Sequence, residues 1–314
     1  DIHDADALII RTRTRCDETL LKGSKVSFIA TATIGYDHLD IEYLKRAHIT
    51  WTNCPGCNAN SVGQYIHSCL LLLEKEKGYN LSKTTVGLVG VGHVGHAVIE
   101  AIRPLGVQIL LNDPPQKEAL RKAGKPHEFF LKMEELQEKC DIISFHTPLI
   151  TKGPYPTFHL ANKTFFNALK KQPIIINTSR GAVVDNTDVL QALKDGIIRD
   201  AIIDTWENEP NINQELLNLI YIGTPHIAGY SADGKANATR MALTALCNHF
   251  HLPVTFQIRV PQLPEEELPE PNLTETERAL VLYNPHTDSL KLKSHPTMFE
   301  ELRGNYPLRR EFIE

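Results

Sequence analysis

An arginine, two glutamates and a histidine follow three apolar runs in the second half of the sequence. Arg180 comes after "PIIINTS", Glu207 and Glu209 come after "AIIDTW", and His226 comes after "IYIGTP". Each run is typical of a buried strand, and the ends of neighbouring parallel strands meet at one edge of a sheet. We therefore expect these side chains to converge on one site.

These residue types suit the removal of a hydride from a 2-hydroxy acid. A guanidinium holds an α-carboxylate through two parallel hydrogen bonds, a histidine takes the hydroxyl proton, and a carboxylate orients the imidazole. The spacing does not choose between Glu207 and Glu209. Taken singly, each residue also has a structural interpretation: Arg180 as a solvated loop end, Glu209 as the acid before a proline, and His226 as a loop histidine.

A glycine-rich stretch, "TVGLVGVGHVGHAV", predicts a dinucleotide site. Gly90 permits a tight turn after a strand, Gly92 lets the backbone approach a pyrophosphate, and Gly95 lets a helix pack on the strand. His93 is expected to contribute its backbone N–H rather than to catalyse. Asp113, 18 positions after Gly95, ends the next apolar run and stands where a carboxylate binds the ribose of NAD and disfavours NADP. The alternative is a glycine-rich turn in another kind of α/β sheet.

Composition limits the class of protein. The 314 residues are 42% hydrophobic and 23% charged, with a formal net charge of -5, which fits a globular chain of two domains and disfavours a nucleic-acid partner. Apolar runs such as "CLLLL" are too short to cross a membrane. Six cysteines without a framework pattern favour the cytoplasm. Because the chain begins at Asp1 inside an apolar pattern, we expect it to be a fragment.

Short apolar runs alternate with helical spacing, which predicts an α/β fold with parallel sheets. Helices are expected at 61–75, 93–104, 132–139 and 187–195, and the last is expected to be capped by Asp185. Two longer helices, at 58–77 and 232–250, are expected to cross between domains. The predicted division is a substrate domain at 1–57, a dinucleotide domain at 58–228, a returning helix at 229–252 and a C-terminal region at 253–314.

Four motifs, "VGLVGVGHVG", "NTSRGAVVD", "DTWENEP" and "TPHIAG", resemble the D-isomer-specific 2-hydroxyacid dehydrogenases. The resemblance implies a Rossmann-type doubly wound parallel sheet with a smaller flavodoxin-like α/β substrate domain, and NAD as cofactor. It also implies that Arg180, Glu209 and His226 form the catalytic set, with no metal. Glu209 is thereby favoured over Glu207.

The same resemblance assigns the remaining site residues. The implied cofactor contacts are Gly90, Gly92, His93, Val94, Gly95, Asp113, Thr147, Thr178, Ser179, Arg180, Asp204 and Gly229. The implied substrate contacts are Thr12, Thr33 and Tyr230. The "CPGC" stretch at 54–57 is interpreted as a turn and not as a redox or metal site, because no second ligand pair accompanies it.

Longer motifs, including "TATIGYDHLD", "FHTPLITKGPYPTFHLAN" and "IGTPHIAGYSADGKA", resemble one branch of the family, whose substrate is 4-phospho-D-erythronate. The branch implies oxidation to (R)-3-hydroxy-2-oxo-4-phosphobutanoate in pyridoxal 5′-phosphate synthesis. Two alternatives remain: another D-2-hydroxyacid dehydrogenase, acting on phosphoglycerate or glycerate, and an NADH-sensing corepressor-type protein. The complete arginine, glutamate and histidine set favours catalysis.

Two further segments carry expectations about partners. Arg11 and Arg13 flank Thr12 after the apolar run "ALII", and strand alternation would put both arginines on one side, where either could attract a substrate phosphate. The tail at 274–314 has apolar positions at helical spacing in "ERALVLY" and "FEELRGNY" but too few for its own core. It is expected to form a homodimer, or alternatively to fold back on its own subunit.

Overall fold

A computed structural model describes residues 2–311. Its contacts divide the chain into two compact units. Unit 1 combines the described part of Asp1–Ala59 with Tyr230–Leu263 and the described part of Arg310–Glu314, and unit 2 combines Asn60–Gly229 with Pro264–Arg309. The chain therefore leaves unit 1, builds most of unit 2, returns to unit 1 and goes back to complete unit 2.

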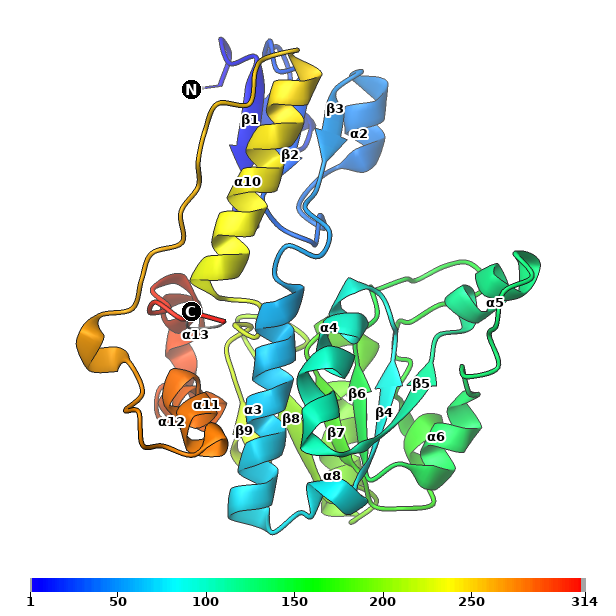
Figure 1. The fold of residues 1–314 in the computed structure, drawn as a ribbon. Helices are drawn as coiled ribbons and strands as arrows, with labels where there is room; N and C mark the ends of the chain where they lie inside the picture. The colour runs from blue at the N-terminus through cyan, green and yellow to red at the C-terminus, as the bar shows by residue number, and fades with distance from the viewer. Residues whose placement is uncertain (1, 312–314) are drawn as a thin grey trace. The chain divides into compact units, whose positions relative to one another are not determined.

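Unit 2 is built on a six-stranded parallel sheet (Figure 1). Its strands are β4 (Thr85–Val89), β5 (Gln108–Asn112), β6 (Ile142–Phe145), β7 (Ile174–Asn177), β8 (Asp200–Ile203) and β9 (Ile222–Gly223). They lie in the order β5-β4-β6-β7-β8-β9, and every neighbouring pair is parallel. The order reverses between β4 and β6, which is where α/β sheets bind ligands beyond the carboxyl ends of their strands.

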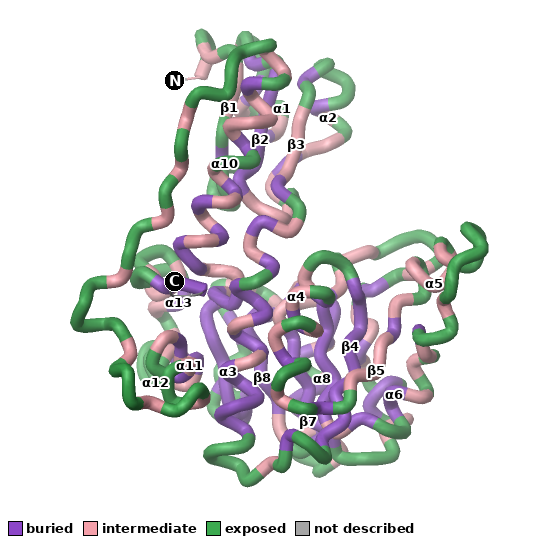
Figure 2. The backbone as a smooth tube through the Cα atoms, in the orientation of Figure 1, coloured by how far each residue is buried: buried purple, intermediate pink, exposed green. Residues whose placement is uncertain are grey.

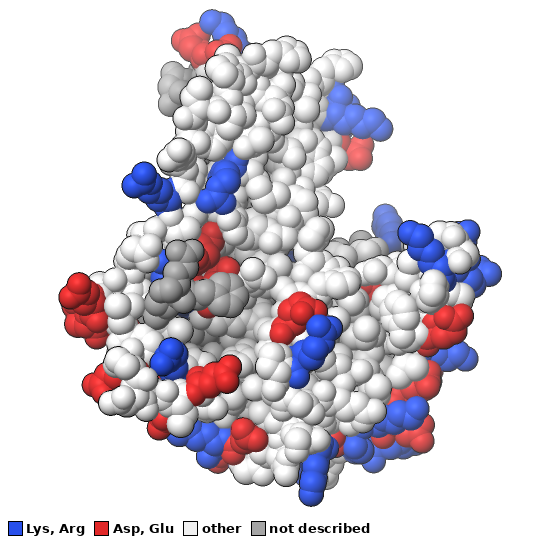
Figure 3. All heavy atoms as spheres, in the orientation of Figure 1, with Lys and Arg blue, Asp and Glu red and all other residues white. Residues whose placement is uncertain are grey.

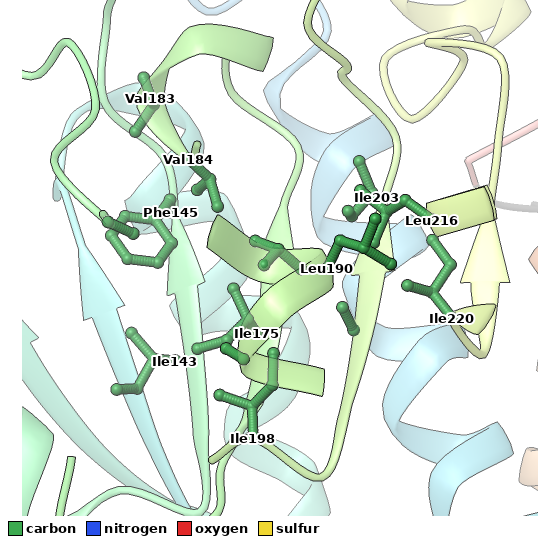
Figure 4. Packing of buried hydrophobic residues seen from close by; sticks show 14 of the residues in the cluster. Ile143, Phe145, Ile175, Val183, Val184, Leu190, Ile198, Ile203, Leu216 and Ile220 are labelled. Atoms are coloured by element: carbon green, nitrogen blue, oxygen red, sulfur yellow. The ribbon is translucent and has the colours of Figure 1, made fainter. Parts of the chain in front are cut away.

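The apolar sequences of these strands explain why the sheet is covered on both faces. All residues of β4, β6 and β7 are buried, and the strands of this sheet are largely purple in Figure 2. Alternate residues such as Ile143, Phe145, Ile175 and Ile203 point to one face, where they pack with Leu190 (Figure 4). Helices α6 (Met133–Lys139), α7 (Lys163–Asn167), α8 (Asn186–Lys194) and α9 (Gln214–Leu219) supply the rest of that layer.

Helices α3 (Ala59–Lys77) and α4 (His93–Ile102) cover the other face (Figure 1). They approach closely because α3 carries Gly63, where a Cβ atom would lie 2.9 Å from the carbonyl oxygen of Ala97 on α4. The predicted helices near 61–75, 93–104, 132–139 and 187–195 are all present, and Asp185 caps α8 by accepting hydrogen bonds from the N–H groups of Thr187 and Asp188. The parallel sheets and their helices confirm the α/β class.

Unit 1 contains a smaller parallel sheet, in the order β1 (Ala7–Ile10), β2 (Phe28–Thr31), β3 (Thr50–Thr52). Helices α1 (Glu18–Leu21) and α2 (Ile41–Arg46) supply Leu21 and Leu44 to the core on one face, which also includes Ile29. Helix α10 (Ala232–His249) packs Ala238 and Ala242 against Phe28 on the other face. The chain therefore comes back from unit 2 with α10, which completes the core of unit 1.

The chain around Arg11 and Arg13 corrects one expectation. Strand β1 ends at Ile10, and a turn follows in which the N–H of Thr14 donates to the carbonyl of Arg11 at 3.3 Å. Strand alternation therefore does not apply to this segment, and Arg11, Thr12 and Arg13 are exposed turn residues.

The C-terminal segment of unit 2 forms helices α11 (Glu275–Leu282), α12 (Pro285–Ser294) and α13 (Phe299–Gly304). Leu292 and Phe299 are fully buried and belong to the main core of unit 2. Ser289 on α12 accepts a hydrogen bond from the N–H of Gly223 at 2.9 Å, so this helix covers the edge strand β9. The segment thus packs on its own unit, while Val281 and Leu290 remain exposed.

The surface and the cysteines show nothing unusual for a globular chain. On the face drawn in Figure 3, Lys and Arg side chains alternate with Asp and Glu. All six cysteines are buried and unoxidised, and burial raises the pKa of Cys57 to about 12, so it carries a thiol rather than a thiolate. Within residues 2–311, every helix is too short or too polar to span a bilayer.

Candidate active site

The predicted site residues of unit 2 follow successive strands of its sheet. The glycine loop follows β4, Thr147 follows β6, Arg180 follows β7, Glu209 follows β8 and His226 follows β9. Because these strands are parallel neighbours, their following loops all lie at one edge. The sheet order therefore brings the cofactor loop and the three candidate catalytic residues to the same end of unit 2.

The glycine loop has the geometry that a dinucleotide requires. Gly90 has a φ of 90°, and a Cβ there would lie 2.8 Å from the carbonyl oxygen of His146, so only glycine fits. A Cβ on Gly95 would lie 2.4 Å from the Gly90 oxygen. At Gly92, by contrast, a Cβ would have no neighbour within 4 Å, and this residue is the N-cap of α4 without a capping side chain. The first-turn N–H groups, including those of His93 and Val94, are thus open to an anion.

Asp113 lies against this loop, as its spacing predicts. Its Oδ2 accepts a hydrogen bond from the N–H of Val91 at 2.8 Å, and its Oδ1 accepts from the N–H of Gln116 at 3.0 Å. Asp113 therefore also caps helix α5 (Pro114–Lys122), which the sequence pattern did not predict. The carboxylate is held in place beside the position where a ribose would follow the pyrophosphate.

Two threonines and a neutral histidine form the next part of the edge. The hydroxyl oxygen of Thr147 is buried without a hydrogen-bond partner among the described residues, which suits contact with a bound ligand. Thr178 Oγ1 lies 3.3 Å from Nδ1 of His146, whose Nε2 lies 2.9 Å from Ser144 Oγ. Burial lowers the pKa of His146 to about 3, so this ring remains neutral and supports the loop rather than exchanging protons.

Arg180 is held by the side chain of Asn177, the last residue of β7. The Asn177 amide donates to the carbonyl of Arg180 at 3.0 Å, and its oxygen accepts from the N–H and hydroxyl of Ser179 at 3.1 and 2.8 Å. One Arg180 guanidinium nitrogen donates to the carbonyl of Ser179 at 2.8 Å. The half-buried guanidinium therefore rests on a fixed loop rather than on a flexible one.

Gly181 stands directly behind Arg180 because the loops after β7 and β8 touch at this residue. A Cβ on Gly181 would lie 1.9 Å from the carbonyl oxygen of Trp206, a distance that no side chain can tolerate. The close backbone contact joins the loop of Arg180 to the loop of Glu209.

His226 and Glu209 form a direct pair. Nδ1 of His226 lies 2.8 Å from Oε2 and 3.2 Å from Oε1 of Glu209, and Oε1 also accepts from the N–H of Trp206 at 2.8 Å. Among the described residues, Nε2 of His226 makes no hydrogen bond. A carboxylate on Nδ1 fixes the proton there and leaves the lone pair of Nε2 available to a substrate.

Glu207 is engaged elsewhere, which resolves the choice that spacing left open. Its Oε1 lies 2.7 Å from Nε2 of His159, and its Oε2 accepts from the N–H of Asn186 at 2.8 Å. Nδ1 of His159 lies 3.1 Å from Asp185 at the start of α8. Glu207 thus joins two loops, and only Glu209 contacts the imidazole of His226.

Asp204 holds the His226 loop from below. This carboxylate is almost fully buried and accepts from the hydroxyl of Thr224 at 2.7 Å and from the N–H groups of Ile227 and Ala228 at 2.7 and 3.0 Å. Burial raises its pKa, although the charge of His226 and these hydrogen bonds oppose the effect. His226 itself has a φ of 56°, a costly conformation for histidine that these contacts impose.

The predicted substrate residues belong to unit 1. Thr12 lies in the exposed turn after β1, and Tyr230 begins the segment that leads into α10, with the ammonium of Lys235 5.3 Å from its ring centre. The Thr33 hydroxyl donates to the carbonyl of Gly35 at 2.7 Å. Gly229 is the last residue of this stretch of unit 2. The roles of these residues remain predictions.

Several residues that shape the site carry no motif that would predict them. Trp206, His159 and the buried Arg309 were not singled out, and Arg303 on α13 lies 3.9 Å from Glu209. The sequence offers one signal for the two arginines: Arg303 and Arg309 are cations within the C-terminal segment whose apolar spacing predicts association. Nothing local to either arginine indicates a contact with residues about 80 to 90 positions earlier.

Comparisons with known proteins agree with this geometry. A family model, "D-isomer specific 2-hydroxyacid dehydrogenase, NAD binding domain", matches residues 70–228. Erythronate-4-phosphate dehydrogenase of Bacteroides fragilis is 54% identical over 99% of this chain and 87% of its own length. The protein of that name from Escherichia coli O157:H7 is 40% identical over 98% and 83%.

Solved structures show the same fold. An NAD⁺-bound 3-phosphoglycerate dehydrogenase of Entamoeba histolytica superposes with a TM-score of 0.67, at 27% identity over 84% of each chain. A D-lactate dehydrogenase of Aquifex aeolicus, complexed with NAD and lactic acid, gives a TM-score of 0.66 at 23% identity over 80% of this chain and 84% of its own.

The contact at Gly181 yields a first prediction. In Gly181→Ala the added methyl group must push the Trp206 carbonyl away and thereby separate the loops of Arg180 and Glu209. We expect a fall in unfolding free energy of about 1–3 kcal/mol, as for other overpacked sites, together with a lower kcat/KM. Thermal unfolding and initial rates measure the two effects. Gly92→Ala serves as a comparison for stability alone: its methyl group meets open space, so it should lower the unfolding free energy less than Gly181→Ala does.

Proposed function

The chain belongs to the D-isomer-specific 2-hydroxyacid dehydrogenase family, and we propose that it oxidises the C2 hydroxyl of 4-phospho-D-erythronate with NAD. The product is (R)-3-hydroxy-2-oxo-4-phosphobutanoate, a precursor in pyridoxal 5′-phosphate synthesis in the cytoplasm. The observation that carries the reaction is the His226–Glu209 pair, at the same sheet edge as the glycine loop. The name and high identity of the Bacteroides relative support this substrate.

The catalytic chemistry follows from three side chains. The Arg180 guanidinium binds the substrate carboxylate and so orients C2. Nε2 of His226 accepts the proton of the C2 hydroxyl, while Glu209 stabilises the imidazolium that results. NAD supplies the acceptor for the hydride that leaves C2. Proton and hydride thus leave the alcohol for separate acceptors, and a keto group remains.

The proposed cofactor residues lie in the loops at the carboxyl ends of the strands of unit 2. Open first-turn N–H groups and Gly92 receive the pyrophosphate, and Asp113 receives the ribose hydroxyls. Thr147, Thr178, Ser179, Asp204 and Gly229 complete the proposed set. Asp204 is included for its place beneath the His226 loop, although the described hydrogen bonds of its carboxylate all go to that loop.

Removal of the proton acceptor tests the mechanism. His226→Ala should lower kcat by roughly 10²–10⁴-fold while NADH binding, measured by fluorescence, stays within error. The paired variants Glu209→Gln and Glu207→Gln separate the two acids. Only Glu209→Gln should reduce turnover strongly, since Glu207 serves His159 and Asn186. Near-normal turnover in His226→Ala would contradict the role of this histidine.

The phosphate end of the substrate provides the test of the proposed substrate. We propose that Thr12, Thr33 and Tyr230 contact substrate and that Arg11 or Arg13 attracts its phosphate. The parent should prefer 4-phosphoerythronate to erythronate by roughly 10²-fold or more in kcat/KM, the worth of two charge-assisted hydrogen bonds. Arg11→Ala or Arg13→Ala should reduce that ratio.

A panel of acids distinguishes the alternatives. Greater activity on 3-phosphoglycerate or glycerate would assign the chain to a sibling enzyme, and NADH binding without turnover of any acid would indicate a sensor. A preference for 4-phosphoerythronate that neither arginine affects would locate the phosphate elsewhere.

We also propose that the protein is a homodimer through its C-terminal helices. The exposed Val281 on α11 and Leu290 on α12 support this, because large apolar side chains on one segment favour association. Val281→Asp and Leu290→Asp should shift sedimentation from dimer to monomer. Point variants are preferable to truncation, since Leu292 and Phe299 belong to the core of unit 2. A monomeric parent would exclude the dimer.

A further inference from the structure

A guanidinium and an imidazole share one carboxylate oxygen at the active site. Oε2 of Glu209 lies 2.8 Å from Nδ1 of His226 and 3.9 Å from a guanidinium nitrogen of Arg303 on α13. The side chains of Arg303 and Glu209 are only 15% and 19% exposed, so water screens this interaction less than it screens a surface pair. The cation therefore acts directly on the catalytic pair.

Two acids among the described residues also act on this pair. Asp204 lies buried beneath the His226 loop, and Glu300, 3.6 Å from Arg303, is about half exposed. Burial by itself would raise the pKa of Glu209, but the charge and hydrogen bond of His226, the N–H of Trp206 and the charge of Arg303 together hold it below the usual value. Glu209 thus remains a carboxylate, with the imidazole of His226 and the guanidinium of Arg303 both beside its Oε2.

The segment that carries Arg303 is anchored firmly. Arg309, five residues beyond α13, is buried and donates to the carbonyls of Ile227 and Ala228 at 3.3 and 2.7 Å, directly after His226. Its guanidinium carbon lies 4.0 Å from the ring centre of Tyr283. Residues 299–309 therefore contact both the Glu209 and the His226 loops, although they lie beyond the family model, which ends at residue 228.

We propose that Arg303 is a positioning residue that shares the charge of Glu209 and thereby keeps His226 in its proton-accepting form during oxidation. This inference rests on the proposed function. A carboxylate beside an imidazole favours the imidazolium, and a cation on the far side of that carboxylate opposes the effect. Oxidation needs neutral imidazole, so the guanidinium extends oxidation to lower pH.

The direction of the pH effect follows from this charge sharing. In Arg303→Gln the full charge of Glu209 acts on the imidazole, so protonation of His226 occurs at higher pH. In the pH profile of oxidation, kcat/KM falls on the acidic side, which we call the acidic limb. The midpoint of this limb should shift to higher pH by about 0.5–1 unit, while kcat/KM on the plateau at high pH stays the same. Reduction of the keto acid needs the imidazolium, and its basic limb should move up by the same amount.

Three further variants separate charge from structure. Arg303→Lys keeps the cation and should return the limb toward the parent. Glu300→Gln removes a carboxylate that competes for Arg303, so its limb should move slightly to lower pH. Glu301→Gln, an exposed acid of the same helix, is the matched control and should change nothing. Should Arg303→Gln fail to fold, Arg303→Met replaces it, and the acidic limbs of both Arg303→Lys and Glu300→Gln should then lie at lower pH than that of Arg303→Met.

A readout independent of turnover keeps this inference separate from the proposed substrate. The imidazole C–H resonance of His226, identified by its loss in His226→Asn, is titrated by NMR in the full chain with NADH. Its midpoint should rise in Arg303→Gln even if 4-phosphoerythronate is not the substrate. An unshifted midpoint and an unshifted limb would overturn the proposal, as would a lost plateau that lysine does not restore, because that result indicates only structural damage.

Discussion

One tryptophan connects the three loops that carry the proposed catalytic residues Arg180, Glu209 and His226. The carbonyl of Trp206 lies against Gly181, its N–H donates to Glu209, and its indole N–H donates to the carbonyl of Thr224 at 2.9 Å, two residues before His226. Each contact uses a different group of the same residue, so a displacement of any loop strains the other two. The spacing of the Arg180, Glu209 and His226 loops is therefore set by two hydrogen bonds of Trp206 and by steric exclusion at Gly181.

The site also combines strain with buried charge. His226 is kept at a positive φ because the carboxylate of Asp204 receives the N–H groups of the residues that follow it. An unpaired carboxylate at that depth would be very costly, and its three hydrogen bonds offset much of the cost. The same hydrogen bonds that satisfy the carboxylate of Asp204, and so make its burial tolerable, also determine where the imidazole of His226 lies. Changes in this loop should therefore alter stability and activity together.

Much of the fold was predictable because its signals are local. The glycine loop and the apolar strands of unit 2 are each encoded within about ten residues. Strand β3 was missed because "TWT" is short and only partly buried, and α5 was missed because it begins with two prolines after Asp113. In the site, spacing left Glu207 and Glu209 equivalent, since the positions of His226 and His159, which distinguish them, depend on the whole fold. Arg303 was beyond reach for the same reason: its partner is 94 residues away in the chain.

The anchoring of Arg309 has a consequence for the order of folding. Its guanidinium donates to carbonyls 82 and 81 residues earlier, and to that of Ser61, 248 residues earlier. Contacts of such sequence separation form late, because the loops that they close are long. During synthesis the ribosome has already released the entire Rossmann sheet before these donors emerge. The glycine loop of a nascent chain can therefore form well before the His226 loop receives its contacts from Arg309.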